Sequence, residues 1–172
     1  KAVLVACGTV STTAMDEVAA SCALPVFGVV EPAAKEAAGR TRNNRIGLIG
    51  TPATVRSGAF ERKILAANPR AKVIGIACPL SVPLVENGRF LPGDRVTEMV
   101  AEEYLAPLLK AGVDTLLLGC THYPMLIDII SSIMGKDVAL VDAGREAARF
   151  AARLLKDRDA LADTGRPGSC QY

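Results

Sequence analysis

Two cysteines occupy equivalent places in this sequence, each just after an apolar run. Cys7 follows the run at 2–6, and Cys120 follows the run at 113–118. A threonine lies within two positions of each cysteine, and a segment of helical spacing comes next. Ligands of parallel α/β sheets bind at the carboxyl ends of strands, beside the first turns of helices. The spacing therefore predicts two half-sites that face each other across one cleft.

These two cysteines have the chemistry needed to move protons at a carbon atom. A thiol beside a helix N-terminus is expected to have a lowered pKa, because free N–H groups and the helix dipole stabilise the thiolate. The same N–H groups, with the hydroxyls of Thr9 and Thr121, would bind a carboxylate. With a thiol on each side of an amino-acid Cα, one face loses a proton while the other gains one. Such a pair would invert the carbon without a cofactor.

The only histidine of the chain, His122, lies two residues after Cys120. Free imidazole ordinarily titrates near neutral pH, so a histidine at this place could relay the proton of that thiol. A simpler interpretation is also open, in which His122 is a surface residue and the cysteines are small buried hydrophobic residues. A third is an amidase in which Cys120 is the nucleophile and Cys7 is incidental. Phosphatase chemistry is disfavoured, because no arginine in the loop after Cys120 could cradle a phosphate.

Strand-like and helix-like segments alternate along the chain. Strands are predicted at 2–6, 26–30, 46–50, 72–77, 113–118 and 138–141, and helices at 12–21, 33–40, 54–67, 96–111, 125–134 and 145–156. The proline-containing segment 78–93 is predicted to be a long loop. Asp94 and Gly112 are predicted to cap the helix that lies between them. This alternation predicts an α/β fold with mostly parallel sheets and right-handed crossovers.

The composition excludes several classes of protein. Lys and Arg number 20 and Asp and Glu number 18, which gives a net charge of +2. The basic residues are scattered, so no nucleic-acid partner is expected. The longest apolar runs have the length of strands, so no membrane span is expected. Five cysteines without a Cys-x-x-Cys pair, and a single histidine, predict no metal site and favour free thiols in the cytoplasm.

The first residues carry one misleading signal. The stretch "VLVACG" looks like a lipoprotein cleavage site at Cys7, but only the short apolar run 2–6 precedes that cysteine. A secretory signal has an apolar core of about 7–15 residues after a basic region. We therefore interpret the stretch as a strand. The chain also begins at Lys1, directly on that strand and without methionine, and we expect it to be part of something longer.

Four motifs together resemble one known family. They are "VACGT" at 5–9, "IGTPATV" at 49–55, "CPLSVPLVENG" at 78–88 and "GCTHYPML" at 119–126. In these motifs, and in their order, the chain resembles the glutamate racemases of the aspartate/glutamate racemase family. The stretch Gly-Cys-Thr-His-Tyr-Pro is highly specific for them. Aspartate racemases keep two cysteines but differ after the second.

The resemblance implies a fold, an activity and a set of site residues. The fold would be an α/β, parallel-sheet, two-domain architecture with the substrate between the domains. The activity would be cofactor-independent racemisation of glutamate, which supplies D-glutamate for peptidoglycan, and members are often homodimers. The catalytic groups would be Cys7, Cys120, His122 and Glu86, and the substrate contacts would be Gly8, Thr9, Thr51, Thr54 and Thr121.

Some of these residues have another interpretation from the sequence alone. Thr51 and Thr54 are first of all predicted caps of the helix that begins near Pro52. Glu86, beside Asn and Gly, has the character of a solvated loop charge. The resemblance adds a role in the site to each of them.

The sequence departs from the family pattern in three places. The opening segment, with an Asp-Ser-Gly-type loop and a Pro-Tyr-Gly loop, is absent. Gly8 stands where the family usually has an asparagine that holds the substrate, so this amide is missing and the backbone is looser. Ala143 stands where the family usually has a serine. These departures keep two alternatives open: a catalytically silent racemase-like protein that binds an amino acid, and a racemase for another amino acid such as aspartate.

The missing segment also divides the chain unevenly between the two domains. We expect residues 30–141 to form a complete second α/β domain. Residues 1–29 and 142–172 would be remnants of an incomplete first domain. Such remnants should leave an apolar sheet edge exposed near 2–6. We expect these 172 residues alone to have little or no activity.

Overall fold

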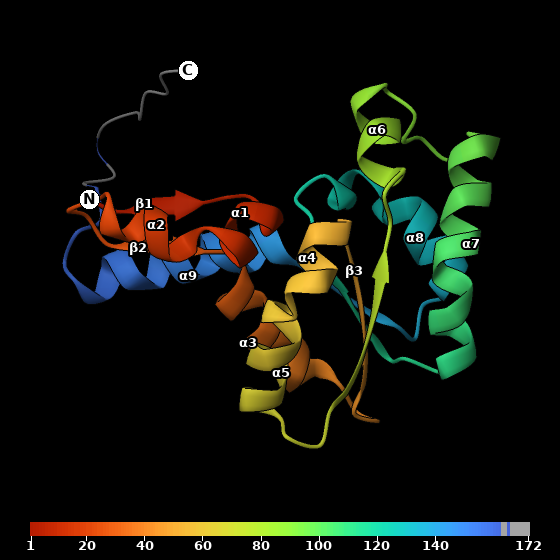
Figure 1. The fold of residues 1–172 in the computed structure, drawn as a ribbon, viewed down its shortest axis with the longest axis horizontal. Helices are drawn as coiled ribbons and strands as arrows, with labels where there is room; N and C mark the ends of the chain where they lie inside the picture. The colour runs from red at the N-terminus through yellow and green to blue at the C-terminus, as the bar shows by residue number, and fades with distance from the viewer. Residues whose placement is uncertain (163–164, 166–172) are drawn as a thin grey trace.

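The computed structural model describes residues 1–162 and 165 as a mixed α/β fold (Figure 1). The strands are β1 (Val3–Val5), β2 (Val26–Gly28), β3 (Arg45–Gly50), β4 (Lys72–Ala77), β5 (Thr115–Leu118) and β6 (Ala139–Asp142). The helices are α1 (Gly8–Thr13), α2 (Met15–Ala20), α3 (Val30–Arg40), α4 (Pro52–Ser57), α5 (Ala59–Ala67), α6 (Ser81–Glu86), α7 (Arg95–Ala111), α8 (Ile127–Met134) and α9 (Ala143–Asp157), with the 3-10 helix η1 (Tyr123–Leu126).

The strands form two sheets in which the described pairings are parallel. The larger sheet has the order β4-β3-β5-β6, and the smaller sheet pairs β1 with β2. In the central strands β3 and β5, every residue after Arg45 is buried, as expected for parallel strands that are covered on both faces. The predicted α/β fold with parallel sheets is thereby confirmed.

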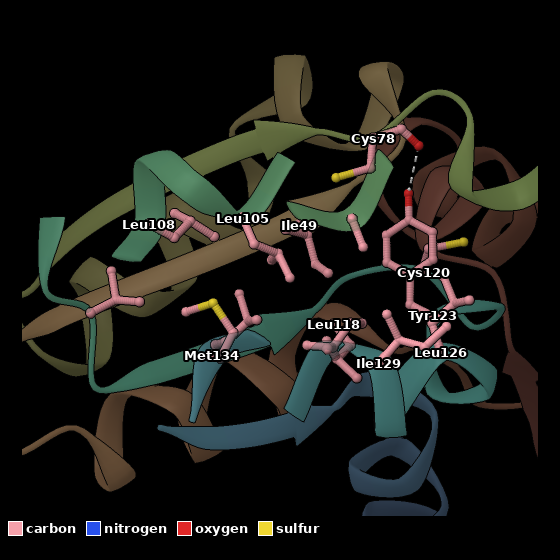
Figure 2. Packing of buried hydrophobic residues seen from close by; sticks show 14 of the residues in the cluster. Ile49, Cys78, Leu105, Leu108, Leu118, Cys120, Tyr123, Leu126, Ile129 and Met134 are labelled. Carbon is pink, nitrogen blue, oxygen red and sulfur yellow. Dashed lines mark hydrogen bonds between the residues drawn. The ribbon is translucent and has the colours of Figure 1, made fainter. Parts of the chain in front are cut away.

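Helices cover both faces of the larger sheet (Figure 1). Successive residues of β5 point to opposite faces, so Leu116 and Leu118 pack with residues of α7 and α8, while Leu117 packs with residues of α3 and α5. Figure 2 shows the first of these clusters from close by. Ile49 of β3 pairs in register with Leu118 of β5, so the segments after these two strands leave the sheet at the same edge.

Helix α9 lies along the smaller sheet in Figure 1. The ring of Phe150 in α9 meets the ring of Phe27 in β2 edge to face, with 5.3 Å between centroids. The residues of β1 are half-buried. Helix α9 also packs against α3 in one core cluster, and part of the predicted first domain, residues 163–164 and 166–172, lies outside the described residues. The division into domains stays a prediction.

The predicted long loop at 78–93 was wrong in its middle, where α6 spans Ser81–Glu86. Proline at position 83 counted against a helix. It lies in the first turn of α6, where a backbone N–H has no partner within the helix, so its missing donor costs little. This correction matters because α6 carries Glu86.

Two predicted helices are each divided in two. The helix predicted at 54–67 is broken at Gly58, which has a φ of 63°, a left-handed value that glycine adopts without a steric penalty. The helix predicted at 12–21 begins earlier, at Gly8, and is interrupted at Ala14. The earlier start makes Cys7 the N-cap residue of α1.

Both caps predicted for α7 are confirmed. The Oδ1 atom of Asp94 accepts a hydrogen bond from the N–H of Thr97 at 3.0 Å, and Gly112 follows the helix with a φ of 64°. Asp94 also accepts a hydrogen bond from Arg89, with 2.9 Å between Nε and Oδ2. Arg89 and the Thr97 backbone together lower the pKa of Asp94 to about 2.

The charge of Asp94 is expected to make stability depend on pH at the acid end. Its pKa in the folded state is below the ordinary value of 3.8, so the unfolded chain binds more protons between these values and stability rises with pH there. Asp94→Asn keeps a cap acceptor but lacks the charge. In thermal melts we expect its Tm to be below that of the unmodified protein at neutral pH, and the two to converge as the pH falls through about 2. A difference that stays constant down to that pH would contradict this explanation.

Candidate active site

The carboxyl ends of β1 and β5 bring the two predicted half-sites together. Cys7 follows β1 as the N-cap residue of α1, and Cys120 follows β5 by two residues. The hydroxyl of Thr121 donates a hydrogen bond to the carbonyl of Ala6 at 3.2 Å, so the segments that carry the cysteines are in direct contact. Cys7 is half-buried and Cys120 is buried.

The pKa of Cys120 is raised, which is opposite to the expectation from the sequence. Burial is the main cause, the charges of ionised Cys7 and of Glu86 add to it, and a hydrogen bond from the His122 backbone opposes it. The helix-dipole argument fails here because no α-helix begins at this cysteine. The 3-10 helix η1 begins at Tyr123, and α8 follows only after it. The buried thiol therefore keeps its proton and needs a neighbouring base in order to ionise.

A line of side chains connects Cys120 to a carboxylate. The Sγ atom of Cys120 lies 3.7 Å from Nδ1 of His122, and Nε2 of His122 lies 3.2 Å from Oε1 of Glu86. A neutral imidazole that donates its Nε2–H to Glu86 has an unprotonated Nδ1 facing the thiol. This arrangement can accept the proton of Cys120 and return it. The structure thus places three of the predicted catalytic side chains in successive contact, from Cys120 through His122 to Glu86.

Three of the predicted substrate-binding threonines form a cluster of hydroxyls. The Oγ1 atoms of Thr9 and Thr51 are 2.9 Å apart, and those of Thr51 and Thr54 are 3.0 Å apart. The hydroxyl of Thr51 also accepts a hydrogen bond from the Thr54 N–H, which confirms its predicted role as the cap of α4. Thr121 lies apart from this cluster and bonds to the backbone of β1's end. The cluster joins α1 to α4, which lie side by side in Figure 1.

Gly8 contacts the opposite strand end through backbone atoms. A Cβ atom at this position would lie 2.1 Å from the carbonyl oxygen of Gly119 and 3.6 Å from Oγ1 of Thr54. Real Cβ atoms do not approach another atom so closely, and the obstacle is backbone rather than a movable side chain. An asparagine at position 8, as the family resemblance would suggest, does not fit this arrangement. Gly8 therefore brings backbone to the site and no amide side chain.

Sequence reasoning assigned no role to Tyr123, although it lies inside the most specific motif. Its side chain is fully buried, and its hydroxyl donates a hydrogen bond to the carbonyl of Cys78 at 3.1 Å (Figure 2). The one available signal was that aromatic residues are scarce in this chain. A large ring directly after the predicted catalytic cysteine and histidine is therefore expected to be buried in the core. Cys78 itself is a packing residue, and burial raises the pKa of its thiol to about 12.

Searches for metal ligands and for membrane spans were negative over the described residues. No group of three or more His, Cys, Asp or Glu side chains there is placed to hold a metal ion. Among the helices of residues 1–162, none has the length and apolar character required to cross a bilayer.

Comparisons with known proteins agree with the geometry. A family profile described as Asp/Glu/Hydantoin racemase matches residues 1–151. The glutamate racemase of Geobacter metallireducens is 43% identical over 172 residues, which are 100% of this chain and 63% of that protein. The chain therefore spans less than two thirds of the length of this relative.

Solved structures show the same architecture. The glutamate racemase isoform RacE1 from Bacillus anthracis superposes with a TM-score of 0.88 at 34% identity, covering 95% of this chain and 60% of that chain. A glutamate racemase from Francisella tularensis, solved in complex with D-glutamate, superposes with a TM-score of 0.86 at 34% identity and covers 97% and 61%. Coverage of about 60% of these chains is consistent with a racemase architecture whose first domain is incomplete here.

Proposed function

Since the chain belongs to the Asp/Glu/Hydantoin racemase family, we propose that it is part of a glutamate racemase, which interconverts L- and D-glutamate by proton transfer. The observation that carries the proposal is the meeting of the Cys7 and Cys120 strand ends, with His122 and Glu86 in line behind the second thiol. The relative at 43% identity is a glutamate racemase, and a similar structure holds D-glutamate. By the same resemblance, we assign the product to peptidoglycan synthesis in the cytoplasm.

The proposed reaction uses the two sulfurs in opposite roles. One sulfur, as a thiolate, removes the proton from the Cα of glutamate and becomes a thiol. The other sulfur, as a thiol, donates its proton to the opposite face of that carbon and becomes a thiolate. The carbon is inverted, protons and charges balance, and no cofactor takes part. His122 and Glu86 serve the buried Cys120, because its raised pKa means that it ionises only when a base accepts its proton.

The threonine hydroxyls are suited to bind the anionic ends of glutamate. Thr9, Thr51 and Thr54 form one polar cluster beside Gly8, and Thr121 lies next to Cys120. The hydrogen of a hydroxyl group can rotate toward whichever acceptor is present. Hydroxyl groups can therefore donate hydrogen bonds to the carboxylates of glutamate. We assign the cluster to one end of the substrate and Thr121 to the other, where its hydroxyl would turn from the Ala6 carbonyl toward the substrate.

The experiment that tests the function measures both optical activity and isotope exchange in the protein at its encoded length. D-glutamate is incubated with the protein and followed by circular dichroism. The expected result is decay of the signal to zero, with deuterium from D₂O at the Cα of the product. Retention of the signal despite tight binding of glutamate would contradict the proposal and favour a silent amino-acid-binding protein. Faster decay with D-aspartate than with D-glutamate would instead assign aspartate as the substrate.

One observation favours the silent binder as a second candidate function. Gly8 places backbone against Gly119 at the point where the family resemblance calls for a substrate-binding amide. A protein with this contact could hold an amino acid without turning it over. Isothermal titration with D-glutamate, together with the optical assay, separates the two functions.

The rate of racemisation is expected to be bell-shaped in pH. Turnover requires one thiolate and one thiol at the same time, so it fails when both sulfurs are protonated and when both are ionised. When Cys120 acts as the acid it must keep its proton, and activity is lost as the pH rises through its pKa. Because burial raises that pKa above the ordinary 9.0, we expect the alkaline limb to lie above pH 9.0. Initial rates across the pH range check this, and a flat profile through the limbs would contradict a two-thiol mechanism.

A further inference from the structure

A second bridge, buried in the core, joins the Cys120 turn to the segment that carries Glu86. The hydroxyl of Tyr123 donates to the Cys78 carbonyl at 3.1 Å, and Figure 2 shows this bond beside Cys120. Cys78 directly follows β4, and α6 begins three residues later. Tyr123 directly follows His122 in the sequence. We call the contacts from Cys120 through His122 to Glu86 the relay. The buried bridge and the relay therefore connect the same two segments of the chain.

The relay is too exposed to fix its own geometry. The side chains of His122 and Glu86 are 37% and 61% exposed. Exposed pairs of this kind are weak, because water and salt screen them and because both side chains lose freedom when they meet. The separation of the two side chains must then depend on where the backbone places the His122 turn and the end of α6.

The Tyr123 hydroxyl is suited to hold these two backbone segments together. Its side chain is fully buried, and burial raises its pKa far above the ordinary value, so the hydroxyl remains a donor at any working pH. Its acceptor, the Cys78 carbonyl, also accepts the Ser81 N–H at 3.3 Å in the turn that begins α6. One phenol thus ties the turn beside His122 to the first turn of the helix that ends at Glu86.

We propose that Tyr123 is a positioning residue, whose buried hydrogen bond to the Cys78 carbonyl holds Glu86 in reach of His122 and so keeps the imidazole directed at Cys120. Its effect on rate rests on the proposed racemase function. Its effect on the contact between His122 and Glu86 is a structural consequence that does not require turnover.

The test uses Tyr123→Phe in the protein at its encoded length, because this change removes the hydroxyl and keeps the ring. These 172 residues contain one histidine, and in the protein at its encoded length the ¹⁵N-histidine signal of His122 is assigned by its loss in His122→Gln, with Glu86→Ala recorded as the spectrum of a lost contact. We expect the Tyr123→Phe spectrum to move toward that of Glu86→Ala. We also expect kcat to fall about tenfold with little change in KM, since small misplacements of catalytic groups are costly.

The matched control is Tyr104→Phe, the same chemical change at a neighbouring tyrosine of the same core cluster that makes no bond to Cys78. The hydroxyl of Tyr104, on α7, accepts the Leu80 N–H at 3.4 Å, so its loss removes one long hydrogen bond at the N-cap of α6 and leaves the bond from Tyr123 to the Cys78 carbonyl in place. We expect its histidine spectrum and its kcat to match the unmodified protein.

Each outcome decides between the proposals. An unchanged histidine spectrum in folded Tyr123→Phe would overturn the positioning role, and so would equal changes in both tyrosine variants. A shifted spectrum in a protein that does not racemise glutamate would support the positioning role and contradict the proposed function alone. Circular dichroism melts confirm that each variant is folded before the spectra are compared.

Discussion

Cys7→Ala and Cys120→Ala are each expected to lower the rate of conversion of D-glutamate to L-glutamate by about 10³-fold, since a positioned acid or base contributes about 10²–10⁴-fold. Each sulfur serves one face of the substrate, and in the proposed mechanism no other group on that face exchanges a proton. Loss of either sulfur therefore stops inversion in both directions. The measurement is the amount of the opposite enantiomer formed in D₂O, and its deuterium content, in the protein at its encoded length.

The pair of variants is more informative than either alone. If Cys120 were the nucleophile of an amidase, Cys7→Ala would leave activity intact and no deuterium would enter the Cα in any variant. Cys22→Ala is the control, because this half-buried free thiol follows α2 and lies outside the proposed site. We expect it to exchange deuterium at the rate of the unmodified protein. Full activity in Cys7→Ala would contradict the two-thiol mechanism.

The alternation of apolar runs and helical segments was sufficient to predict the fold class. Each predicted strand overlaps an observed one, because a parallel strand covered on both faces leaves a continuous apolar run such as that of β5. The pairing order β4-β3-β5-β6 was not predicted. It depends on contacts between residues far apart in sequence, which a local pattern does not contain.

The site was predictable where it depends on strand ends and unpredictable where it depends on tertiary packing. The segments that carry the two cysteines are in contact, although β1 and β5 belong to different sheets, and the role of the pair stays a prediction. The predicted direction of the Cys120 pKa shift was wrong. Burial raises this pKa, and no α-helix begins at Cys120 whose dipole could lower it. Glu86 was identified from family resemblance alone. The sequence pattern did not predict the short helix α6, because Pro83 counts against a helix and because α6 is stabilised by contacts with η1 and α7.

Gly8→Ala is expected to destabilise the fold by about 1–3 kcal/mol, the usual cost of forcing extra atoms into a packed site. The added Cβ would lie 2.1 Å from the Gly119 carbonyl oxygen, and no rotamer change relieves a clash with backbone. For a chain of this size we expect Tm to fall by roughly 2–4 °C for each kcal/mol. Gly39→Ala is the matched control, because Gly39 is exposed in α3 and its added Cβ meets nothing within 4 Å. That substitution should raise stability by up to about 1 kcal/mol through helix propensity.

The same clash has a consequence for activity, because Gly8 follows Cys7 and Gly119 precedes Cys120. A side chain at position 8 pushes the two thiols apart instead of relaxing into a local gap. Gly8→Asn should therefore lower Tm whatever the protein does, while its effect on turnover separates the two candidate functions. If the contact seen here belongs to a working racemase, turnover falls together with Tm. If glycine has silenced a racemase-like protein, the asparagine restores a substrate contact and turnover of D-glutamate rises while Tm falls. An unchanged Tm in both Gly8 variants would contradict the close backbone contact itself.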